Sequence, residues 1–188
     1  MQERQGFQVR PWLVWTAGFL VFPVAGIVAT ALAGRIDDAV SALVGGLAAG
    51  AVIGAGQWLV ARRDLDPRTW IPVTAVAMGI GLLAGAQLVD YDTGLGDLAL
   101  MGAITGIPLG AAQAFLLRSH FSHAWIWAAA MPVLWALGWT VTTVGGIHVE
   151  NQFAVFGAYG AITFIALSGV LLDRLRATTP PGQPPVRP

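Results

Sequence analysis

The stretch GLAAGAVIGAGQWLVARR, residues 46–63, decides the fold of this chain. Its glycines recur every four residues, a glutamine follows three residues later, and two arginines end the apolar run. Nearly the same phrase returns as GAITGIPLGAAQAFLLR at residues 102–118. The positions shared by the two copies are Gly46, Gly50, Gly54, Gln57 and Arg62 in the first, and Gly102, Gly106, Gly110, Gln113 and Arg118 in the second. Residues four apart lie nearly above one another on a helix, so each copy predicts a helix with a glycine ladder along one face.

The composition is that of a membrane protein. Of the 188 residues, 56% are hydrophobic and 11% are charged, whereas soluble domains carry about 25% charged residues. The mean hydropathy of +0.69 agrees with this class. The chain has no cysteine and no lysine, which excludes disulfides, thiolate metal sites and Schiff-base chemistry. The formal net charge is zero, so no nucleic-acid partner is implied. We therefore expect no cofactor and no nucleic-acid binding.

Six apolar runs are long enough to cross a bilayer, which takes roughly 20 helical residues. They cover residues 12–34, 39–61, 70–89, 98–117, 125–147 and 153–172. The polar breaks between them are short, and short connections join antiparallel neighbours. The sequence therefore predicts an all-α membrane protein, a compact bundle of six transmembrane helices.

The distribution of charged residues predicts on which side of the membrane each helix end lies. With six spans, every arginine except Arg35 falls on one side of the membrane, and most carboxylates fall on the other. Under the positive-inside rule the arginine side is cytoplasmic, so we expect both termini in the cytoplasm and the chain in the inner (plasma) membrane. Several tryptophans lie near the arginine ends, where an interfacial aromatic belt is expected. They are Trp12, Trp15, Trp58, Trp70, Trp125 and Trp127.

The chain is predicted to contain three repeated hairpins, about residues 12–63, 70–118 and 125–174. A weaker third copy of the ladder begins at Gly157, and Ser168 stands there in the place of the glutamine. The odd-numbered spans each open with tryptophan. Each hairpin holds two spans, so successive copies enter from the same side and form parallel repeats, a pseudo-threefold bundle. We expect one membrane domain over residues 1–176 and a disordered, proline-rich tail over 177–188.

The ladders and glutamines allow two interpretations. Glycines permit the close backbone contact that drives helix association in lipid, but a glycine face is also a groove that a lipid chain or small hydrophobic ligand could enter. Likewise, Gln57 and Gln113 could bind neighbouring helices, or with Ser168 could line a polar vestibule for an ion or solute. Packing is the simpler interpretation for both features. Helix breakers within the first, fourth and fifth spans, Pro23, Pro108 and Pro132, are common in ordinary membrane helices too.

One outer loop is a weak candidate for a cation site. The sequence DYDTGLGD places Asp90, Asp92 and Asp97 beside glycines, as calcium loops do. The full EF-hand pattern also needs a carboxylate at its twelfth position, where this chain has Met101. An acidic, solvated rim is the simpler explanation.

No motif points to an enzyme. No carboxylate lies near the middle of a span, as proton-coupled pumps commonly require. The residues around Ser168, ALSGV, do not form a G-x-S-x-G elbow.

The phrase QWLVARR, residues 57–63, resembles a loose group of uncharacterised bacterial multipass membrane proteins with repeated glycine-rich hairpins of the GxxxGxxQWLVLRR type. QAFLLRS, residues 113–119, carries the resemblance in part. The resemblance implies a fold and no activity.

Two functional hypotheses remain. The chain binds or translocates a small solute, lipid or ion at the repeat interfaces. Alternatively, it is a non-catalytic scaffold or accessory subunit that packs against itself or a partner membrane subunit through its glycine faces.

Overall fold

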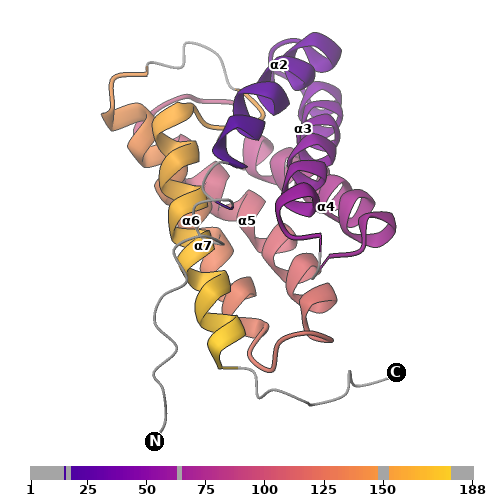
Figure 1. The fold of residues 1–188 in the computed structure, drawn as a ribbon. Helices are drawn as coiled ribbons and strands as arrows, with labels where there is room; N and C mark the ends of the chain where they lie inside the picture. Colours follow the sequence, from indigo (N-terminus) through magenta and orange to yellow (C-terminus); the bar gives the residue numbers. More distant parts are fainter. Residues whose placement is uncertain (1–14, 16–17, 63–64, 148–152, 179–188) are drawn as a thin grey trace, which may run out of the picture.

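Helices make up all the regular structure in the part of the chain that the computed structural model describes, which is residues 15, 18–62, 65–147 and 153–178 (Figure 1). The elements are the 3-10 helix η1 (Gly18–Leu20) and the α-helices α2 (Val21–Ala33), α3 (Ala39–Val60), α4 (Pro67–Leu88), α5 (Leu95–Leu117), α6 (Trp125–Val144) and α7 (Ala158–Ala177). The all-helical prediction is confirmed.

Five of these helices, α3 to α7, are long and apolar enough to cross a membrane. The first apolar run is described only over Gly18–Ala33, a shorter apolar helix, because much of residues 12–17 lies outside the described ranges. Large apolar side chains face outward on several helices, among them Ile27 on α2, Ile80 on α4 and Val133 on α6. An outer surface of this kind suits lipid. The structure thus supports a multipass membrane protein.

Polar residues in the connections fix where two helices begin. Asp38 and Ser41 form a capping box at the start of α3: the Ser41 backbone N–H donates to Asp38 Oδ1 at 2.7 Å, and the Asp38 N–H donates to Ser41 Oγ at 3.1 Å. Asp66 caps α4 in a similar way, and Pro67 occupies the first helical position, where its missing N–H costs nothing.

The last helix begins later than the apolar run predicted. Residues 153–172 were expected to form the span, but α7 starts at Ala158 and continues through Arg174 and Arg176. The preceding residues are not helical because they fold into the core: Ala154, Val155 and Phe156 are all buried. The Phe156 ring stacks on Phe22 at 5.1 Å and meets Trp135 edge-on at 5.0 Å, between ring centroids.

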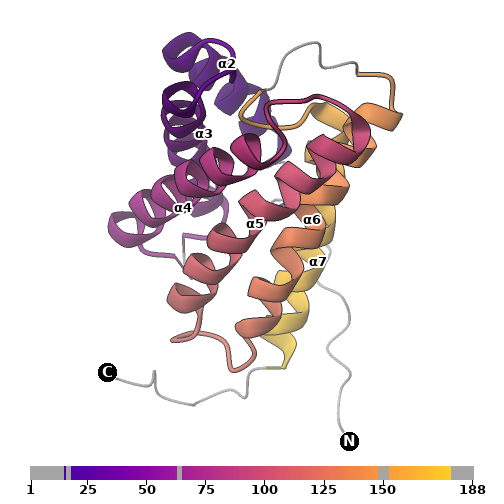
Figure 2. The ribbon, with the colours of Figure 1, turned by 180° about the vertical axis from the view of Figure 1, so that it is seen from behind.

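Neighbours in sequence are neighbours in space, and they run in alternating directions (Figures 1 and 2). The pairs α3–α4 and α5–α6 pack most closely. At the far end of the chain, α7 also contacts η1 and α2, which brings the last helix against the first described turn. The predicted tail, residues 177–188, lies almost wholly outside the described residues.

Candidate functional site

The first glycine ladder is a contact surface for α4. A Cβ atom placed on Gly46 would lie 2.7 Å from the Gly79 Cα, and one on Gly50 would lie 2.8 Å from the Ala75 Cα. A Cβ atom on Gly54 would lie 3.1 Å from the Cβ of Thr74. Real Cβ atoms do not approach as closely as 2.7 or 2.8 Å, so Gly46 and Gly50 are needed to bring the two backbones together, and Gly54 is tightly packed beside them.

The second ladder meets α6 in the same way. A Cβ on Gly106 would lie 2.6 Å from the Met131 carbonyl oxygen, and Gly102 and Gly110 are blocked by Trp135 and Met131. Both ladders are therefore filled by a neighbouring helix. A further glycine face was not predicted: Gly81 and Gly85 on α4 press against the backbone of α5.

The two glutamines form one buried polar cluster with Trp70, Thr74 and Trp127. Gln57 Oε1 accepts from Trp70 Nε1 and from Gln113 Nε2, both at 3.1 Å. Gln113 Nε2 also donates to Thr74 Oγ1 at 3.2 Å, and Gln113 Oε1 accepts from Trp127 Nε1 at 3.0 Å. Gln113 and Thr74 are wholly buried, and Gln57 is 5% exposed. The cluster joins α3, α4, α5 and α6 by side-chain hydrogen bonds.

Ser168, the counterpart of the glutamines, belongs to a separate contact. Its hydroxyl accepts from Trp15 Nε1 at 3.2 Å and donates to the Ile165 carbonyl at 3.2 Å. Each of three buried tryptophans thus donates to the polar residue at the ladder's end: Trp15 to Ser168, Trp70 to Gln57 and Trp127 to Gln113.

The expected aromatic belt needs a correction. Trp15, Trp70 and Trp127 are at most 5% exposed and lie inside the bundle, because each indole N–H has a polar partner there. Of the described members, Trp125 is the one that faces outward strongly, at 67% exposure. One sequence signal marked Trp70 and Trp127 as related residues: they follow Gln57 and Gln113, the glutamines that they bind, by nearly the same number of residues, 13 and 14.

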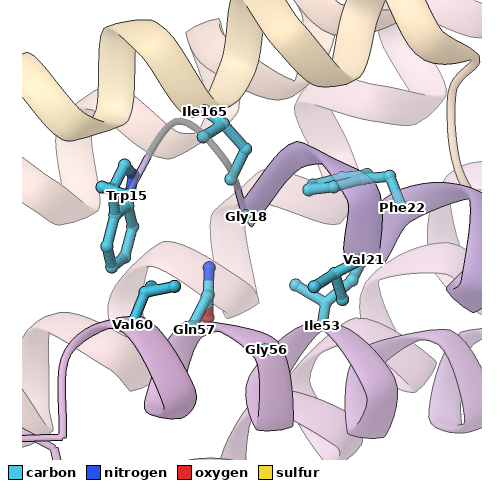
Figure 3. A pocket seen from close by; sticks show the side chains of 9 residues that line it. All are labelled: Trp15, Gly18, Val21, Phe22, Ile53, Gly56, Gln57, Val60 and Ile165. Atoms are coloured by element: carbon cyan, nitrogen blue, oxygen red, sulfur yellow. The ribbon is translucent and has the colours of Figure 1, made fainter. Parts of the chain in front are cut away.

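The two glutamine amides are used unequally. Both polar atoms of Gln113 are hydrogen-bonded, whereas Gln57 uses its oxygen twice and its Nε2 has no partner among the described residues. Gln57 lines a cavity of about 10 Å³ between α3, η1, α2 and α7. Figure 3 shows its amide nitrogen directed into this cavity, toward Gly18 and Ile165.

A second cavity of about 10 Å³ lies beside the three buried tryptophans. Its other walls include Ala61, Leu117 and Leu172. In the sequence, these three residues follow Gln57, Gln113 and Ser168, respectively, by four positions each.

The residues predicted as a cation site, Asp90, Asp92 and Asp97, lie in the connection from α4 to α5 and in the first turn of α5. Within the described ranges, no three His, Asp or Glu side chains are grouped so that they could hold a metal ion. Asp90 has a left-handed backbone with φ of 49° at the end of α4, and Asp97 lies in the first turn of α5. In the connection before α3, hydrogen bonding to the Ser41 N–H lowers the pKa of Asp38 below its ordinary value of 3.8, in keeping with its place as the cap of that helix.

Comparisons with protein-family models, with curated proteins and with solved structures found no match.

Proposed function

We propose that the chain is a six-span protein of the bacterial inner membrane, built from three parallel hairpins with both termini in the cytoplasm. The three tryptophan bonds support this arrangement, because they join spans two and three, four and five, and six and one, in a cyclic order. The walls of the second cavity repeat at equivalent positions, as expected near a pseudo-threefold axis.

Within that frame, we propose a non-enzymatic scaffold or accessory subunit. The observation that carries this proposal is the filling of both ladders: their glycines lie against α4 and α6, and all of them except Gly54 are too close to the neighbouring helix for a methyl group to fit without a shift. The buried glutamines likewise serve mainly to hold helices together. The chain then acts through its outer, apolar helix faces, which are free to contact a second copy or a partner membrane subunit.

Site-directed photo-cross-linking in the host membrane tests the scaffold. A photoreactive phenylalanine analogue is placed at one exposed position on each of the helices α2 to α7, using Ile27, Leu59, Ile80, Ile107, Val133 and Ile162. A scaffold gives a protein adduct of one defined mass from positions on a single face. The purified chain in nanodiscs, irradiated alone, shows whether that partner is a second copy. Lipid adducts at every position, with no protein adduct in either setting, would rule out the scaffold.

A second candidate function, binding or translocation of a small solute or lipid at a repeat interface, is favoured by one observation. The Gln57 cavity lies between α3 of the first hairpin and α7 of the third. Native mass spectrometry of the chain released from nanodiscs tests it, because a bound ligand adds a fixed mass to the chain. A bare chain mass under conditions that preserve annular lipid would count against this function.

A further inference from the structure

The amide nitrogen of Gln57 differs from every other polar atom in the buried cluster. Gln57 Oε1 accepts two hydrogen bonds, and Gln113 uses both ends of its amide, but Gln57 Nε2 donates to no described residue. The side chain is 95% buried, being 5% exposed. An amide donor that loses water without gaining a partner costs about 1–3 kcal/mol, so this N–H group needs an acceptor in the cavity that Gln57 lines.

The space in front of this donor suits a very small group. The cavity has a volume of about 10 Å³, roughly that needed for a single water-sized atom. Apart from Gln57, most of its wall is apolar, with Val21, Phe22, Ile53, Val60 and Ile165 around it. None of the described residues that line it is charged, and an ion buried without a counter-charge would be expensive. The occupant should therefore be uncharged and present one oxygen.

We propose that Gln57 Nε2 donates a hydrogen bond to a single uncharged acceptor oxygen held in this cavity. Two sources supply that chemistry: a water molecule, or the ester carbonyl of a membrane lipid. The site deepens the second candidate function above by naming its ligand class. It does not depend on the scaffold, so its failure would leave the scaffold proposal standing.

Side-chain amide NMR on the full chain in nanodiscs tests the site. The glutamines and tryptophans are labelled with ¹⁵N, and the Gln57 side-chain resonance is assigned as the one lost in Gln57→Met. Cross-peaks from the Gln57 Nε2 protons to water identify the first source. Cross-peaks to lipid glycerol or α-methylene protons, which vanish with deuterated lipid, identify the second. Gln113, whose Nε2 is bonded to Gln57 and Thr74, provides the internal reference.

A cavity-filling variant sharpens the test. A Cβ on Gly18 would meet only Val60 Cγ1 at 3.9 Å, an ordinary contact, so Gly18→Val adds carbon to the cavity wall while its Cβ stays out of contact with the amide cluster. The control is Gly96→Val, where a Cβ meets nothing within 4 Å. We expect the Gln57 cross-peaks to be lost in Gly18→Val and kept in Gly96→Val.

The indole resonances of Trp70 and Trp127 should remain in both variants, which shows that the cluster has folded. Gln57 cross-peaks that run only to protein protons in the unsubstituted chain would overturn the proposal. Cross-peaks to water or lipid that persist unchanged in folded Gly18→Val would overturn it as well.

Discussion

Replacing Gln113 by leucine should destabilise the bundle more than the same change at Gln57. Leucine at 113 removes three side-chain hydrogen bonds, to Gln57, Thr74 and Trp127. Leucine at 57 removes two, to Trp70 and Gln113. Interhelical hydrogen bonds in membranes contribute about 0.6 kcal/mol on average and at most about 1.7. We expect losses in the free energy of unfolding of about 2 kcal/mol for Gln113→Leu and about 1 kcal/mol for Gln57→Leu.

The double variant gives a sharper number. The bond between Gln57 and Gln113 is lost in either single variant, so the sum of the single losses counts it twice. The double variant should therefore cost less than that sum, by about 0.6 kcal/mol, one interhelical bond. Gln87→Leu is the matched control, because Gln87 is an exposed glutamine on α4, and surface changes usually stay within about 0.5 kcal/mol.

Reversible unfolding in mixed micelles of detergent and SDS, followed by tryptophan fluorescence, measures these differences. Steric trapping offers an independent scale for the same four variants. Two results would refute the reasoning: a larger loss for Gln57→Leu than for Gln113→Leu, or fully additive losses in the double variant. Either would mean that the cluster does not couple the helices as its geometry indicates.

Three further predictions concern the ladder, the topology and the cap of α3. Gly106→Ala should lower the free energy of unfolding by about 1–3 kcal/mol, as overpacking does, because the added methyl group would meet the backbone of α6. Gly96→Ala on the same helix should leave the free energy of unfolding unchanged or raise it by up to about 1 kcal/mol in the same assay. Equal effects of the two changes would contradict the packing role of the ladder. The chain has no cysteine, so Asp37→Cys should react with an impermeant maleimide on intact cells lacking an outer membrane, and Arg68→Cys only after permeabilisation; the reverse pattern would invert the proposed topology. Because the pKa of Asp38 is lowered in the folded chain, its carboxylate stabilises α3 at pH values above the unfolded pKa, and this stabilisation is lost as the pH falls through the folded pKa, below 3.8. The melting temperature of the parent chain should therefore fall in that pH range. A fall of the same size in Asp38→Asn would assign the loss of stability to other groups.

The sequence predicted the helices well because the signal is strong: an apolar run of about 20 residues has few alternatives in a membrane. It also favoured packing over a ligand groove for the ladders, which agrees with the close approach of Gly46 and Gly106 to their neighbours. It placed the glutamines near helix ends and expected each to bind a neighbouring helix. These inferences needed only the spacing along one helix.

The partners of the polar residues could not be predicted in the same way. The hydrogen bond from Gln113 to Gln57 forms only if α3 and α5 are rotated about their axes so that the two side chains meet. The sequence of one helix does not predict how that helix is rotated relative to another. Trp70 and Trp127 looked like interfacial anchors because tryptophan at a span's end usually is one. The start of α7 was missed because Phe156 belongs to the same apolar run as the helix, although it packs into the core from a non-helical segment.

The hydrogen bond from Trp15 to Ser168 has a consequence for biosynthesis. The two residues are 153 positions apart, and ribosomes add about 5–20 residues per second, so the indole waits roughly 8–30 s for its acceptor. Phe22, which packs on Phe156 and Phe164, waits almost as long. Until α7 has been synthesised, the Trp15 indole has no Ser168 hydroxyl to bind and Phe22 has no Phe164 ring to pack on. We therefore expect a product truncated before α7 to lack the acceptor of the Trp15 indole and one of the two aromatic partners of Phe22, while it keeps the other, Phe156.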